Sequence, residues 1–152
     1  MRATSIWKQD RQFDALSDSG HHVVMDGADA HTGGPSPMEA VLMALCVCTS
    51  IDVVSILKKK REPLISLTVS ASAERAPEAP RVFTHIQLLY RVSGAVSEKA
   101  MVDAVGLSQN KYCSVSKMLE KTATIEFAIE HTSSEATEGS KADPTADRKI
   151  DL

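Results

Sequence analysis

Aromatic residues are scarce in this sequence, with one Trp, two Tyr and three Phe among 152 residues. Proteins that bind single-stranded nucleic acids stack the bases on aromatic side chains, so this composition disfavours such a platform. A basic surface is missing as well, because 17 Lys and Arg are outnumbered by 20 Asp and Glu, for a net charge of −3. We therefore expect no nucleic-acid partner.

Long unbroken apolar runs are also absent. The longest, residues 40–48, is far shorter than the ~20 residues of a membrane helix, and no charged-then-apolar leader stands at the N-terminus. We therefore expect no membrane partner and a cytoplasmic location, where structural disulfides are rare. Hydrophobic residues make up 43% of the chain, which is enough for the core of one domain.

Signatures of cofactor chemistry are missing too. The sequence has no phosphate-binding glycine loop and no Gly-x-Ser-x-Gly elbow. The histidines at 21, 22 and 85 have no cysteine or carboxylate at metal-ligand spacing. We expect no cofactor and no metal site.

The most distinct local signal predicts a helix over residues 37–59. Ser36 and Glu39 form a capping box around Pro37, a preferred first helical residue, and Pro63 lies beyond the basic C-terminal end. The segment is apolar on nearly every side, so we expect it to be buried. At roughly 35 Å, it needs more cover than one thin sheet can supply, which indicates dimerisation.

The remaining patterns predict an α+β fold. A hairpin of residues 2–14 and 21–25 is expected around a turn at 17–20, and a second hairpin is expected from alternating residues at 67–74 and 82–92. Helices are expected at 97–108 and 114–122, followed by a last strand at 124–130. Hairpins imply antiparallel sheets. The polar segment 132–152 has little to bury and is expected to be a disordered tail after a domain of residues 1–131.

Three cysteines are the residues most able to carry chemistry. Cys113 stands just before a predicted helix, whose positive end would favour a thiolate. Cys48 lies within the long helix, and Asp52, one turn later, would disfavour a thiolate there unless a cation intervenes. Cys46 faces elsewhere on that helix. All three can equally be inert core thiols, and Glu39 can be only a helix cap.

Several segments resemble the OsmC/Ohr family, and within it the YhfA-like branch. The resemblance covers about residues 1–131. It rests on the segments 35–39 (PSPME), 50–57 (SIDVVSIL), 78–86 (EAPRVFTHI) and 111–116 (KYCSVS), and on the short stretches 19–21 and 25–27.

The resemblance implies an OsmC-like fold, with a long central helix packed against β-sheets in an intertwined homodimer. It also implies a thiol peroxidase that reduces organic hydroperoxides. Cys48 would attack the peroxide, and Cys113 would resolve the sulfenic acid to a disulfide. The reductant would be a thiol system: thioredoxin, glutathione or a lipoyl protein. An apolar pocket lined by Met43, Val47 and Ile51 would favour organic peroxides.

The family's activating pair is a glutamate and an arginine. Here Met38 stands at the glutamate position, with Glu39 one residue later, and Arg11 is the candidate arginine. Arg81 is a second arginine candidate. These departures leave open an alternative function, a redox-sensing or small-molecule-binding protein that keeps the fold without efficient turnover.

Overall fold

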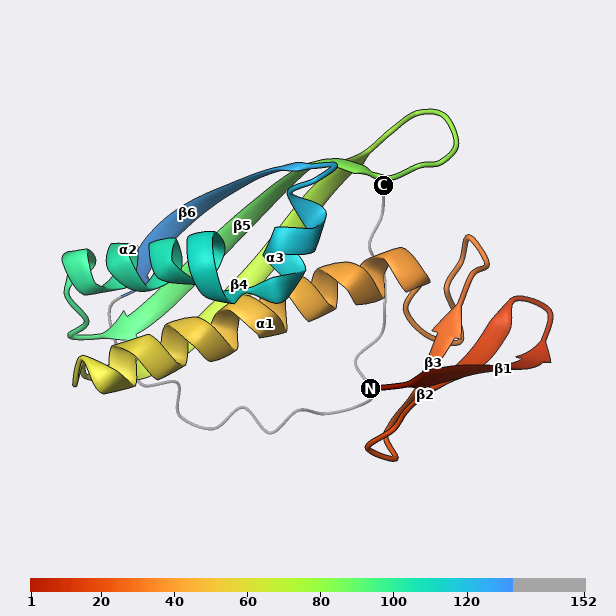
Figure 1. Ribbon diagram of the computed structural model, residues 1–152, viewed down its shortest axis with the longest axis horizontal. Coiled ribbons are helices and arrows are strands. Elements are labelled where there is room, and N and C mark those ends of the chain that lie inside the picture. The colour runs from red at the N-terminus through yellow and green to blue at the C-terminus, as the bar shows by residue number, and fades with distance from the viewer. Residues whose placement is uncertain (133–152) are drawn as a thin grey trace.

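The structure is a computed structural model that describes residues 1–132 (Figure 1). Its elements in chain order are β1 (Ala3–Gln9), β2 (Gln12–Ser17), β3 (His22–Asp26), α1 (Pro37–Lys59), β4 (Leu64–Arg75), β5 (Phe83–Gly94), α2 (Glu98–Leu107), the π-helical turn η1 (Ser108–Tyr112), α3 (Ser114–Leu119) and β6 (Thr124–Thr132). The predicted tail lies outside the described residues except for Thr132, which belongs to β6.

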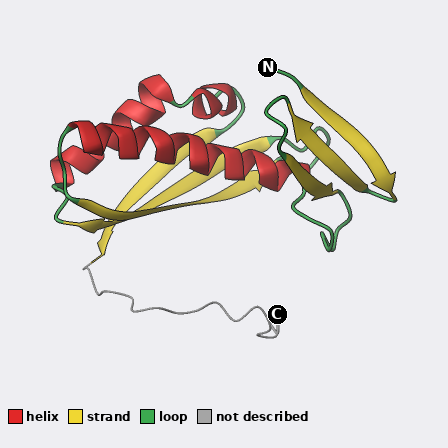
Figure 2. Ribbon diagram, turned by 90° about the horizontal axis from the view of Figure 1, so that it is seen from below, coloured by secondary structure: helices red, strands yellow, loops and turns green. Residues whose placement is uncertain are grey.

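Two three-stranded sheets and a long helix make up the predicted α+β architecture. One sheet has the order β1-β2-β3 and the other the order β4-β5-β6. Figure 2 shows the helices on one side of the larger sheet, with α1 running along it and the smaller sheet set beyond the N-terminal end of α1. The core lies between α1, α2 and the strands β4 and β5.

The larger sheet is mixed, which corrects the expectation of purely antiparallel sheets. β4 and β5 form the predicted antiparallel hairpin, whereas β6 pairs with β5 in parallel, with Ile86 opposite Ile125. The segment between them, α2, η1 and α3, carries the chain back to the starting end of β5, as a parallel connection requires.

The N-terminal segment also differs from its prediction. The expected strand 2–14 is split by a turn at Asp10 and Arg11, so β1, β2 and β3 form a three-stranded meander. Asp10 has a φ of 44°, in the left-handed region that Asp tolerates better than most residues. No glycine or proline marks this turn.

The long helix α1 begins and ends where the sequence predicts. The Ser36 side chain accepts a hydrogen bond from the Glu39 backbone N–H at 3.2 Å, and a Glu39 carboxylate oxygen accepts one from the Ser36 N–H at 2.7 Å. These two bonds satisfy backbone donors that the first turn leaves free. The side chains that α1 buries recur every four residues: Leu45, Thr49, Val53 and Leu57.

The opposite side of α1 is apolar and exposed, so a single protomer does not supply the burial expected on nearly every side. Met43, Val47 and Ile51 are 55%, 59% and 61% exposed in a single protomer. The most apolar 18 residues of α1 have a mean hydropathy of 2.3, so its length and composition would also suffice to cross a membrane. The sequence analysis considered only the unbroken apolar run 40–48, which is shorter than the apolar part of this helix. In this fold α1 packs along β4 and α2.

We expect Leu57→Ala to lower the free energy of unfolding by about 2–5 kcal/mol, because it removes a fully buried side chain from the core. Ser55→Ala, at an exposed position of the same helix, should change it by about 0.5 kcal/mol or less. Urea denaturation of both variants measures the difference. Equal stability of the two variants would contradict the assigned packing of α1.

Candidate active site

The fold brings together two cysteines that are far apart in the sequence. Cys48 projects from the middle of α1, and Cys113 lies between η1 and α3. Their sulfur atoms and a carboxylate oxygen of Asp52 all lie within 4.8 Å of one another. A disulfide needs the sulfurs at about 2.05 Å, so a closure of less than about 3 Å would join them. All three cysteines of the chain are free thiols in this structure.

Cys113 is the buried member of the pair. It is itself the N-cap of α3, and its Sγ accepts a hydrogen bond from the Ser116 backbone N–H at 3.4 Å. Burial raises the pKa of the Cys113 thiol, and neighbouring Cys48 raises it further, while the bonds from Ser116 lower it. The expectation that the helix end makes this thiol acidic is therefore wrong, because desolvation outweighs the helix end.

Asp52 forms the third corner of the site. It lies one turn after Cys48 on α1 and is half-buried. Its carboxylate accepts a hydrogen bond from the Ser108 hydroxyl at 2.9 Å. Among residues 1–132, no Lys, Arg or His forms an ion pair with it. Within this part of the chain, no side-chain cation pairs with Asp52 to offset its charge beside Cys48.

A buried network of polar side chains supports the site. The Thr49 hydroxyl lies 2.7 Å from the Tyr90 hydroxyl and 2.9 Å from that of Ser108. Each hydroxyl has one proton, and Ser108 donates its own to Asp52. Thr49 then donates to Ser108, and Tyr90 donates to Thr49. The hydroxyls therefore form a directed chain that ends at the Asp52 carboxylate.

Gln109 ties this network to the helix that carries the second cysteine. Its amide nitrogen donates to the Tyr90 hydroxyl at 2.8 Å, and its amide oxygen accepts from the Ser116 hydroxyl at 2.9 Å. Burial raises the pKa of Tyr90 to about 12, so the phenol stays protonated as a donor. Among the described residues no buried polar side-chain atom lacks a hydrogen-bond partner. The sequence analysis missed this network, for which the only signal is polar residues at core positions.

Glu39 is engaged in the helix cap. Its hydrogen bonds from Ser36 lower the pKa of its carboxyl group, and it forms no ion pair with an arginine among residues 1–132. Met38, at the position of the family glutamate, packs against the core. The structure thus accounts for Glu39 as a cap, and within one protomer it does not bring Glu39 to an arginine.

The candidate arginines lie on exposed turns. Arg11 is the second residue of the β1–β2 turn, and its backbone carbonyl accepts a hydrogen bond from the Gly27 N–H at 2.9 Å. The carbonyl of Arg81 accepts one from the Arg75 side chain at 2.8 Å. Neither guanidinium forms an ion pair within residues 1–132.

Cys46 lies on another side of α1, as expected. With Met43 and Val47 it lines an apolar hollow of 420 Å³ against β4. Ile51 is not part of this hollow, and neither is Cys48. The predicted apolar pocket therefore belongs to the side of Cys46. Burial raises the pKa of this thiol.

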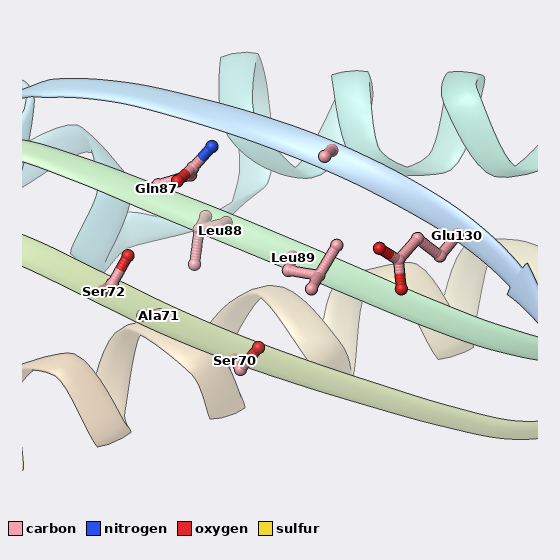
Figure 3. Close-up of a pocket in the computed structure, with 8 residues that line it drawn as sticks. Ser70, Ala71, Ser72, Gln87, Leu88, Leu89 and Glu130 are labelled. Carbon is pink, nitrogen blue, oxygen red and sulfur yellow. The ribbon is translucent and has the colours of Figure 1, made fainter.

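Two other hollows differ in their relation to the thiols. One of 360 Å³ is lined by Asp52, Ile56, Leu107 and Tyr112 and by neither cysteine, so Asp52 is the residue that it shares with the thiol site. Another, of 440 Å³, runs over the outer face of the larger sheet (Figure 3). Its lining comes only from β4, β5 and β6, and in Figure 3 the helices lie behind these strands. That groove is therefore separate from the thiols.

Comparison with known proteins assigns the family. The sequence model of the OsmC-like protein family matches residues 28–128. The chain belongs to the OsmC-like family. It is 46% identical over 131 residues to the protein YhfA of Escherichia coli (strain K12), a match that covers 86% of this chain and 97% of YhfA.

Solved structures agree with the OsmC-like fold. A hypothetical protein from Aquifex aeolicus VF5 has a TM-score of 0.80 at 28% identity, covering 88% of this chain and 97% of that one. An organic hydroperoxide resistance protein from Legionella pneumophila has a TM-score of 0.65 at 10% identity, covering 85% and 96%. At that identity the likeness shows the fold alone.

The raised pKa of Cys113 gives a prediction for its alkylation. A raised pKa leaves less thiolate at neutral pH, so the rate of iodoacetamide labelling at Cys113 should keep rising above the pH where a free cysteine levels off. Peptide mass spectrometry over a pH series measures it, with the urea-unfolded chain as the control. If the labelling rate levelled off at a lower pH than in the unfolded chain, the helix end and not burial would control the pKa of this thiol.

Proposed function

We propose that this OsmC-like protein is a cysteine-dependent peroxidase that reduces organic hydroperoxides in defence against oxidative stress. The observation that carries the proposal is the approach of the Cys48 and Cys113 sulfurs to within 4.8 Å. Two thiols this close can pass through a sulfenic acid to a disulfide without large rearrangement.

The reaction proceeds in two steps. The Cys48 thiolate attacks the terminal oxygen of the hydroperoxide ROOH, the O–O bond breaks, and the alkoxide takes a proton to leave as ROH. The Cys113 thiolate then attacks the sulfur of the sulfenic acid, and hydroxide leaves and is protonated to water. Cys48 is the attacking thiol in this scheme because it is half-buried, whereas Cys113 is fully buried.

An apolar hollow beside Asp52 supports an organic substrate. The hollow beside Asp52 has apolar walls from Ile56, Leu107 and Tyr112, which favour a hydrocarbon group over hydrogen peroxide. Its lining also includes Lys59 and Lys60. A thiol reductant of the cytoplasm, such as thioredoxin, glutathione or a lipoyl protein, would restore both thiols by exchange.

We expect Cys48→Ser to abolish consumption of cumene hydroperoxide with dithiothreitol as the reductant, because it removes the attacking sulfur. Cys113→Ser should still react once and then accumulate a sulfenic acid that dimedone traps. Cys46→Ser is the matched control and should keep the wild-type rate, since Cys46 faces another hollow. Peroxide consumption that survives Cys48→Ser would contradict the proposal.

One observation favours the alternative, a redox sensor or small-molecule-binding protein without efficient turnover. The Glu39 carboxylate is engaged by Ser36, and Met38 replaces the family glutamate. Within one protomer, Glu39 therefore forms no ion pair with an arginine among residues 1–132. On this alternative the thiols would be oxidised stoichiometrically, and no dithiol would sustain turnover.

The proposal includes an intertwined homodimer. Met43, Val47 and Ile51 form an exposed apolar stripe along α1, and Trp7 on β1 is 64% exposed. Every residue of β1 is exposed in the single protomer, so the small sheet has little cover of its own. A second copy packed on α1 and on this sheet would bury both surfaces. Cys48 lies beside the exposed stripe, which would place the thiols near the dimer interface.

Val47→Glu should convert the dimer into a folded monomer, because it places a charge in the middle of the proposed interface. Val102→Glu is the control, since Val102 is 47% exposed on α2, away from the stripe. Sedimentation velocity with circular dichroism measures mass and folding together. A wild-type monomer at micromolar concentration, or an unchanged dimer in Val47→Glu, would contradict this interface.

A further inference from the structure

We propose that Cys48, Asp52 and Cys113 form a binding site for a divalent cation that prefers thiolate ligands, and that Zn²⁺ is the ion that fits. The reduced chain would bind this ion, and the oxidised chain would release it. The three ligand atoms lie within 4.8 Å of one another. Thiolate sulfur and carboxylate oxygen are both zinc ligands, at about 2.3 Å and 2.0–2.2 Å from the ion. A tetrahedral ion would need its two sulfurs roughly 3.8 Å apart, so closing the site by about 1 Å completes it.

The spacing of these residues hides the site from sequence analysis. Cys48 and Asp52 are one helical turn apart on α1, as two ligands on one helix face must be. Cys113 joins them only through the fold, from the start of α3. Three protein ligands leave a fourth position for water or a further ligand, as in zinc sites that remain open.

The charges of the site indicate a cation. With both thiols deprotonated, two thiolates and a carboxylate in one half-buried space would repel one another, and no Lys, Arg or His within residues 1–132 pairs with Asp52. A divalent ion would neutralise this charge while displacing the thiol protons. The sequence analysis expected no metal site, because it considered only the histidines and the local spacing of ligands.

Groups behind the ligands are already oriented as a metal site requires. The Ser108 hydroxyl donates to the Asp52 carboxylate at 2.9 Å, and the Ser116 N–H donates to Cys113 Sγ at 3.4 Å. Such outer hydrogen bonds fix the direction of metal ligands and commonly contribute 10–100-fold to affinity. Ser108 and Ser116 are themselves buried and held by the network around Thr49 and Gln109.

Oxidation would release the ion, a step that rests on the disulfide chemistry of the proposed function. One zinc bis-thiolate, one ROOH and two protons give one disulfide, ROH, water and free Zn²⁺. The two sulfurs lose two electrons, and the O–O bond accepts them. A disulfide sulfur is no longer a thiolate ligand, so only Asp52 would remain on the ion.

The test uses the full-length reduced chain under anaerobic conditions, with Zn²⁺ titrated against a chromophoric chelator. We expect one Zn²⁺ per chain. Cys48→Ser, Cys113→Ser and Asp52→Asn should each weaken binding at least about 10-fold, Ser108→Ala about 10-fold, and Cys46→Ser not at all. Absorption of the Co²⁺-substituted chain should report tetrahedral coordination by two thiolates. Circular dichroism confirms that each variant is folded.

Diamide, which oxidises dithiols without a peroxide, should release the Zn²⁺ as the disulfide forms. This arm separates the two proposals, because release by diamide with no reaction toward hydroperoxides would uphold the zinc site and overturn the peroxidase. Failure of the reduced chain to bind Zn²⁺, equal affinity in folded Asp52→Asn and the wild type, or retention of the ion by the oxidised chain would each overturn the zinc site.

Discussion

A directed chain of buried hydroxyl groups is the constraint on which the arrangement of this protein's thiols depends. Tyr90 of β5, Thr49 of α1 and Ser108 of η1 donate one to the next, and the chain ends on the Asp52 carboxylate. Hydrogen bonds in series polarise one another, and a buried hydroxyl without its partner costs about 1–3 kcal/mol. The three elements are thus held in one register. That register sets Cys48 on α1 opposite the turn that leads to Cys113.

The same constraint explains the position of the π-helical turn. η1 follows α2 directly and places Ser108 and Gln109 against α1 before α3 begins at Ser114. Wide π turns are frequent at functional sites because they redirect side chains that a regular helix would point elsewhere. Here the turn places Gln109 so that its amide oxygen accepts a hydrogen bond from the Ser116 hydroxyl of α3. The site therefore forms where the crossover between β5 and β6 packs against α1.

Local signals in the sequence predicted local structure well. The bounds of α1 follow from Ser36 and Glu39 at one end and the basic turn at the other, all within a few residues of the helix ends. The parallel pairing of β6 and the turn at Asp10 were not predicted, because the first depends on topology and the second has no glycine or proline beside Asp10 to mark it. The pairing of Cys48 with Cys113 came from the family resemblance alone, since nothing near either residue indicates the other.

The behaviour of Cys113 shows where sequence reasoning failed. The helix end that favours a thiolate is visible in the sequence, whereas the burial that opposes it exists only in the folded chain.

Disulfide mapping after oxidation tests the central claim, that the fold places Cys48 and Cys113 close enough to form a disulfide directly. The reduced protein is treated with one equivalent of tert-butyl hydroperoxide, and its free thiols are blocked before digestion and mass spectrometry. The account predicts a Cys48–Cys113 bridge within seconds, and a bridge through Cys46, or no oxidation at all, would contradict it.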